Sequence, residues 1–169
     1  MVANQHFQRL KHIYTSSSES GADQIAISYG RAELEGTIEA VPSGAILQER
    51  AHDQLLRDAA ALAAGSVEKE HVVTTEQFSV DVARTDYEGA VVASAEVELA
   101  EAPRYVVRAV LVDDDGELVA EARAVFRTGD DTLPPDPSPD ATDAEAVPTP
   151  PPASFMPVHT TPFGMLCLN

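Results

Sequence analysis

The stretch Ile46–Ala64 contains neither proline nor glycine, and its second half is almost entirely alanine and leucine. Such a composition predicts one long helix. Because that half has no polar face, other elements must surround the helix, and its small side chains let a sheet approach closely. Pro42-Ser43-Gly44 breaks the chain before the helix, and Gly65 is predicted to end it as the C′ residue.

Alternating apolar and polar residues predict strands on both sides of this helix. A short amphipathic helix at His6–Tyr14 and two paired strands, Gln24–Tyr29 and Ala32–Glu39, precede it. Asp113-Asp114-Asp115-Gly116 predicts a hairpin turn between the last two of the later strands. Four strands in a meander follow the helix, at 72–84, 89–100, 105–112 and 117–127. Long antiparallel strands that enclose one apolar helix make an α+β fold.

The composition changes near Gly129, and this predicts where the folded domain stops. Residues 129–169 hold ten of the twelve prolines and no lysine or arginine. We therefore expect a domain over 1–128 and a disordered, acidic, Pro-rich tail over 129–169. The apolar stretches Phe155-Met156 and Phe163–Leu168 either dock on the domain or a partner, or belong to an unselected terminus.

The chain is strongly acidic, with a formal net charge of −17. This charge opposes binding to nucleic acid or an anionic membrane. Lys11 and Lys69 are the only lysines, a composition that fits either adaptation to high salt or an ordinary acidic protein from a GC-rich genome. Cys167 is the only cysteine, which excludes an internal disulfide, and neither a secretory signal nor a membrane span is visible. We expect a cytoplasmic protein.

Several stretches, taken in order and spacing, resemble the hotdog fold of the acyl-CoA thioesterase superfamily, and within it the phenylacetate-degradation (PaaI-like) branch. The likeness covers roughly residues 6 to 127. It rests on His6–Tyr14 as the opening helix, Leu55–Ser66 as the central helix, Val73–Phe78 with Arg84 in the next strand, and Asp115–Ala120 with Phe126 in the final hairpin.

The resemblance implies a curved antiparallel sheet around a central helix, whose carboxylate acts as base or nucleophile toward a CoA thioester. It also implies an oxyanion hole of backbone N–H groups at the start of that helix. The family's site lies between two subunits, so a homodimer, or a homotetramer built from dimers, is expected.

At the site itself the sequence departs from the family. Gln48-Glu49 stands where the family has His-Gly, and Arg57 stands at the carboxylate position, with Asp58 one residue later. A shift of one residue turns a side chain by about 100° around a helix. Asp58 would therefore not automatically point at the same spot as the family carboxylate. Asp58 and Glu49 are nevertheless the candidate bases, and Gln48 is a candidate to polarise a carbonyl. The alternative for each is an ordinary helix residue.

Three further residues are candidates for substrate binding: Arg57, Thr75 and Arg84, the last through a CoA phosphate. A cross-strand ion pair is the alternative for Arg84. His52-Asp53 suggests acid–base chemistry, or an exposed structural histidine.

No nucleophile elbow, glycine-rich phosphate loop or metal-ligand spacing is visible, and no cofactor is expected. The sequence therefore predicts a protein that binds an acyl-CoA or related thioester and hydrolyses it if the altered site works. The alternative is a catalytically silent module for acyl-ligand binding or protein assembly.

Overall fold

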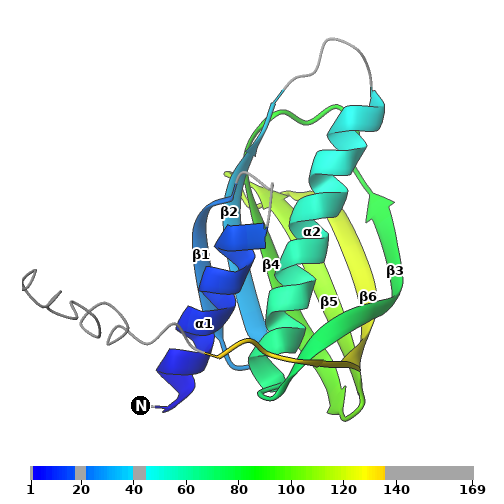
Figure 1. Ribbon diagram of the computed structural model, residues 1–169. Coiled ribbons are helices and arrows are strands. Elements are labelled where there is room, and N and C mark those ends of the chain that lie inside the picture. Colours follow the sequence, from blue (N-terminus) through cyan, green and yellow to red (C-terminus); the bar gives the residue numbers. More distant parts are fainter. Residues whose placement is uncertain (1, 18–21, 40–44, 136–169) are drawn as a thin grey trace, which may run out of the picture. The chain divides into compact units, whose positions relative to one another are not determined.

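The computed structural model describes residues 2–17, 22–39 and 45–135, which form two helices and six strands (Figure 1). The α+β class and the predicted order of elements are confirmed. The elements are α1 (Val2–Ser17), β1 (Ala22–Ser28), β2 (Arg31–Ile38), α2 (Ala45–Val67), β3 (His71–Val82), β4 (Gly89–Glu101), β5 (Arg104–Asp113) and β6 (Leu118–Thr132).

The six strands form one sheet in the order β1-β2-β4-β5-β6-β3, and every neighbouring pair is antiparallel. The sheet curves around α2, which lies across its inner face, and α1 lies beside α2 (Figure 1). Strict alternation along β2 turns Ala32, Leu34 and Ile38 inward and leaves their neighbours exposed. The predicted four-strand meander is wrong for its first strand: β3 pairs with β6 at the edge of the sheet and not with β4, so of these four strands only β4, β5 and β6 form a meander.

α2 is enclosed as its sequence predicts. From Leu55 to Ser66 no residue is exposed, and Leu56, Ala59, Ala60, Ala63 and Ala64 are inaccessible to solvent. Alanine side chains let the backbone of α2 approach the sheet, whose own core face is rich in alanine and valine. The apolar surface buried by this contact supplies the main driving force for folding of the domain.

The prediction that Gly65 ends the central helix is wrong, because α2 continues through Gly65 to Val67. Gly65 instead marks the crossing point with α1. A Cβ added there would lie 3.3 Å from Cδ2 of Leu10, and Nε2 of His6 donates a hydrogen bond to the Gly65 carbonyl oxygen at 2.8 Å. The glycine thus allows α1 to pack closely on the end of α2.

The folded domain also extends beyond the predicted boundary at residue 128, because β6 runs to Thr132. Within β6, Gly129 passes so close to β3 that an added Cβ would lie 2.7 Å from the carbonyl oxygen of Val72. Leu133 is buried, and its N–H donates a hydrogen bond to the Glu70 carbonyl oxygen at 2.9 Å. The carbonyl oxygen of Leu133 accepts a hydrogen bond from the side chain of Arg9 in α1. The rest of the predicted tail, residues 136–169, lies outside the described residues.

Candidate functional site

The side chain of Arg57 extends from α2 toward the edge strand β3. Its guanidinium lies over the ring of Phe78, with Cζ 4.3 Å from the ring centroid. Nη2 of Arg57 also donates to Oδ2 of Asp53, one helical turn earlier, at 3.2 Å. Both charged side chains are about two-fifths exposed, at 40% and 42%. A carboxylate and a cation therefore share the stripe of α2 that faces β3, beside an aromatic ring.

Asp58 points in a different direction, toward α1. Its Oδ2 accepts a hydrogen bond from the hydroxyl of Tyr14 at 2.8 Å, and its Oδ1 accepts one from the amide of Gln54 at 2.8 Å. The one-residue step from Arg57 to Asp58 thus separates the two side chains, as the helical rotation requires. Within the part of the chain that the structure describes, Asp58 contacts Tyr14 and Gln54, whereas Arg57 contacts Asp53 and Phe78.

The remaining candidates on α2 and β3 are spread out. Gln48 and Glu49 belong to the first turns of α2, but their side chains lie outside the described residues. His52 is fully buried, so the expectation of an exposed histidine is wrong. Thr75 is exposed on β3, at the point where the register with β6 shifts.

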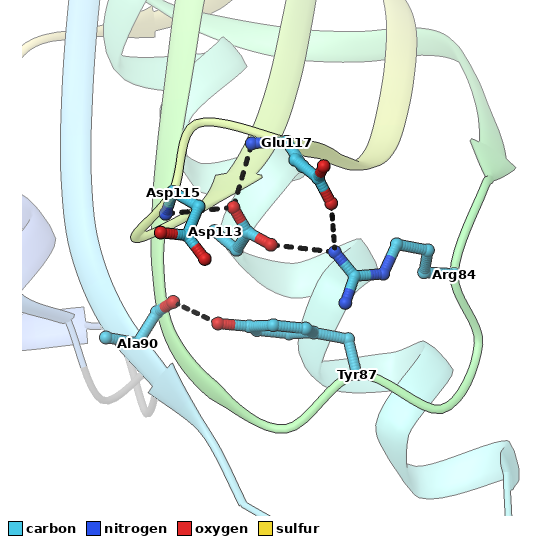
Figure 2. A network of polar contacts seen from close by, with 6 residues as sticks. All are labelled: Arg84, Tyr87, Ala90, Asp113, Asp115 and Glu117. Carbon is cyan, nitrogen blue, oxygen red and sulfur yellow. Dashed lines mark hydrogen bonds and ion pairs between the residues drawn. The ribbon is translucent and has the colours of Figure 1, made fainter.

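Arg84 lies just beyond the end of β3 and takes part in the ion pair that the sequence left as an alternative (Figure 2). Its Nη1 donates to Oδ2 of Asp113 at 2.7 Å and lies 3.5 Å from Oε2 of Glu117. The guanidinium also covers the ring of Tyr87, whose hydroxyl donates to the carbonyl oxygen of Ala90. These contacts join the β3–β4 connection to the turn between β5 and β6.

Asp113 organises that turn, and the predicted hairpin is confirmed. Its Oδ1 accepts the backbone N–H groups of Asp115 at 3.1 Å and Glu117 at 2.8 Å, while Gly116 adopts a φ of 81°. The N–H of Glu117 lowers the pKa of the Asp113 carboxyl; burial raises it, and Arg84 lowers it further, so the pKa lies below its ordinary value. An ionised Asp113 keeps Arg84 engaged, and the acidic residues around the turn oppose the approach of a phosphate.

The C-terminal end of α2 carries a polar cluster that sequence reasoning missed. Oε2 of Glu68 accepts the hydroxyl of Tyr105 at 2.7 Å and that of Thr128 at 3.2 Å; Oε1 accepts the N–H groups of Glu70 at 3.1 Å and His71 at 3.3 Å. Burial works against ionisation of Glu68, but these hydrogen bonds outweigh it and hold its pKa below the ordinary value. Burial and the neighbouring Glu68 raise the pKa of Tyr105. The only sequence signal for this cluster was the position of Glu68 directly after the helix.

Ser66 joins the same end of α2 to the β1–β2 hairpin. Its buried hydroxyl donates to the carbonyl oxygen of Ala63 at 2.6 Å and accepts the N–H of Gly30 at 2.8 Å. Gly30 has a φ of 73°, which glycine adopts without strain and which the tight turn requires. The helix and the turn are thus connected through one hydroxyl group.

A shallow hollow of about 830 Å³ crosses β1, β2, β4 and β5 on the face of the sheet opposite α2. Its charged lining is already paired: Arg31 bonds Glu96 at 2.7 Å, and Arg108 bonds Glu121 at 2.7 Å. The candidate residues on α2 do not line it. We therefore place the candidate site on the β3-facing side of α2 and not in this hollow.

Comparison with solved structures gives likenesses that cover most of the chain. The PaaI protein of the Escherichia coli phenylacetic acid degradation operon superimposes with a TM-score of 0.66 at 19% identity, covering 79% of this chain and 100% of that one. A thioesterase family protein from Silicibacter pomeroyi gives 0.61 at 23% identity, with coverages of 73% and 99%. The chain has the hotdog fold. The predicted resemblance is confirmed at the level of this fold.

A third solved structure, of a protein from Streptococcus mutans, has acetyl-CoA bound; its TM-score is 0.57 at 14% identity, covering 66% of this chain and 91% of that one. Neither the comparison with family models nor that with curated proteins finds a match. Among the described residues, no helix is long and apolar enough to cross a membrane. Within the same residues, no group of three or more His, Cys, Asp or Glu side chains is arranged to hold a metal ion.

Proposed function

We propose that the protein binds an acyl-CoA or a related thioester and hydrolyses it at a site between two subunits. The observation that carries this proposal is the hotdog fold, shared over two thirds of the chain with a protein that holds acetyl-CoA. The enclosed helix α2 supports it, because its β3-facing stripe presents charged groups at the rim of an otherwise apolar core.

The candidate bases from the sequence are Asp58 and Glu49, with Gln48 to polarise the thioester carbonyl. Arg57, Thr75 and Arg84 are the candidates for substrate binding. Of these, Arg57 has the position that best supports contact with a ligand, since it is half-exposed and lies over an aromatic ring. Arg84 is engaged by Asp113, which argues for a structural role.

A specific observation also favours the second candidate function, a catalytically silent module that binds an acyl ligand or assembles with partners. The carboxylate of Asp58 is held by Tyr14 and Gln54, and a cation occupies the position of the family carboxylate. A hydrolase that has lost its base keeps the fold and the ligand groove without turnover.

Two assays on the same panel of acyl-CoAs separate the two functions. Hydrolysis is measured through the release of the CoA thiol, and binding is measured by calorimetric titration. Binding with turnover supports the hydrolase. Binding without turnover of any acyl chain supports the silent module, and the absence of both contradicts the proposal. Asp58→Ala and Glu49→Ala test the two candidate bases in the same assay.

The assay is best run at low and at high salt, because a chain of net charge −17 is relieved of self-repulsion by screening. Maximal activity at molar salt supports adaptation to a saline habitat. Sedimentation under the same conditions tests the proposed homodimer or homotetramer, and a monomer that turns over substrate contradicts a site shared between subunits. A cytoplasmic location is part of the same proposal.

A further inference from the structure

The geometry points to Asp53 as the general base and Arg57 as the oxyanion donor of thioester hydrolysis, in place of Asp58. This inference rests on the proposed function and names two residues that act in it. Asp53 and Arg57 lie one helical turn apart and bond each other at 3.2 Å, on the stripe of α2 that faces β3.

The direction of each carboxylate decides between the two aspartates. Asp58 lies against α1 and accepts two hydrogen bonds, from Tyr14 and Gln54, which occupy both of its oxygens. Asp53 accepts a hydrogen bond from Arg57 at Oδ2, and its side chain is 42% exposed, so solvent water reaches it. Asp53 is therefore placed to accept a proton from water, whereas Asp58 is placed to hold α1 on α2.

Arg57 supplies the second requirement of hydrolysis, a donor for the negative charge that develops on the thioester oxygen. Its guanidinium carries five N–H donors in a rigid plane, of which Asp53 uses one in the described contact. The guanidinium lies over the ring of Phe78, with Cζ 4.3 Å from the ring centroid. The ion pair thus orients the base and the donor relative to each other without using up the remaining N–H groups.

The chemical step is as follows. A water oxygen attacks the thioester carbonyl carbon while Asp53 takes the water proton, and the carbonyl electron pair moves to the oxygen, which accepts hydrogen bonds from Arg57. The tetrahedral intermediate then collapses, the C–S bond breaks, and the proton on Asp53 passes to the leaving sulfur. The products are a carboxylic acid and the CoA thiol, and Asp53 returns to its ionised form.

Four variants test this assignment on the full chain: Asp53→Asn, Asp53→Glu, Arg57→Gln and Arg57→Lys. We expect Asp53→Asn to lower kcat by about 100-fold or more while acyl-CoA binding persists. Arg57→Gln should lower kcat by about 100-fold with little change in KM, because the donor acts on the transition state. Asp53→Glu and Arg57→Lys should each recover part of that loss.

The matched control is Asp81→Asn, which removes an exposed carboxylate from β3 and should leave turnover unchanged. A pH profile adds a second readout: the acid limb of kcat/KM should disappear from the residual activity of Asp53→Asn. Circular dichroism on each variant confirms that it is folded.

Each of the following outcomes overturns the assignment, and they are distinguishable. Full activity of Asp53→Asn rejects Asp53 as the base while the hydrolase function stands, and a loss confined to Asp58→Ala returns that role to Asp58. Binding of acyl-CoA by the wild-type protein without turnover rejects the catalytic pair and supports the silent module. The absence of both binding and turnover shows that the proposed function itself has failed.

Discussion

The two ends of α2 differ in how they are held. At the C-terminal end, Glu68 accepts four hydrogen bonds, Ser66 joins the helix to the β1–β2 turn, and Gly65 receives α1. About two and three turns from the N-terminal end, Asp53 and Arg57 are two-fifths exposed and bond chiefly to each other. The C-terminal end is fixed to its surroundings by buried polar contacts, while the part nearer the N-terminus presents the proposed base and oxyanion donor to solvent.

On the proposed assignment, one helix serves both stability and chemistry. A carboxylate at the C-terminal end of a helix lies at the unfavourable end of the helix dipole, so Glu68 is kept ionised by its hydrogen-bond donors. The N-terminal half has no comparable set of donors among its described side chains. Substitutions at the fixed end should therefore act on folding, and substitutions at the open end on function.

The largest effect on folding is expected for Gly129→Val. The new side chain would start 2.7 Å from the Val72 carbonyl oxygen, so β3 and β6 must separate where Glu68 contacts Thr128. We expect a loss of about 3 kcal/mol in the free energy of unfolding, measured by urea denaturation. Gly116→Ala is the comparison, because nothing lies within 4 Å of its added Cβ. Only the strain of an alanine at a φ of 81° should then lower the free energy of unfolding, by about 1 kcal/mol. Equal losses in the two variants would contradict the close approach at Gly129.

Glu68→Gln should have a smaller but clear effect. The amide keeps one acceptor oxygen and places a donor group beside the hydroxyl and N–H donors of the cluster, which costs about 2 kcal/mol. Thermal unfolding at pH 7 measures the loss, with Glu70→Gln as the matched control because the Glu70 side chain is exposed. Similar losses in both variants would show that Glu68 does not anchor the helix end.

The same glutamate predicts how stability depends on pH. Because folding lowers the pKa of Glu68, its stabilisation is complete above the unfolded value of about 4.3 and is lost as pH falls through the lower folded value. The wild-type protein should therefore lose stability below pH ~4.3 more steeply than Glu68→Gln. Parallel acid-unfolding curves would exclude Glu68 as a contributor.

Asp53→Asn should have the smallest effect on folding. An ion pair whose two partners are about two-fifths exposed contributes little, and we expect a change below about 0.5 kcal/mol in the free energy of unfolding. A loss as large as that of Glu68→Gln would show that the open end of α2 is structural, and the contrast between the two ends would disappear.

The sequence predicted the fold well because its signals were periodic and local. The alanine-rich half of α2 required enclosure, and Asp113–Gly116 had the chemistry of a turn. Two boundaries were missed for the same reason: Gly65 and Gly129 were interpreted as chain breaks, whereas each is the place where another backbone or helix approaches closely. Contacts of that kind join residues far apart in the chain and leave no local pattern.

The candidate site was less accessible from sequence. The i, i+4 spacing of Asp53 and Arg57 was visible, but their direction toward β3 follows from packing against Phe78, and the direction of Asp58 follows from Tyr14. Arg84 could be assigned to a phosphate or an ion pair until Asp113 was located beside it. A role that depends on which neighbour a side chain contacts is set by the tertiary fold and not by the local sequence.

The hydrogen bond from the Gly30 amide to the hydroxyl of Ser66 has a practical consequence. The amide belongs to a turn on the β1–β2 hairpin, yet its electronic environment depends on the position of α2. A glycine amide resonance often falls in an uncrowded region of a nitrogen–proton correlation spectrum. Titration with a thioester while following that one signal would report any displacement of the central helix, without a label introduced near Asp53.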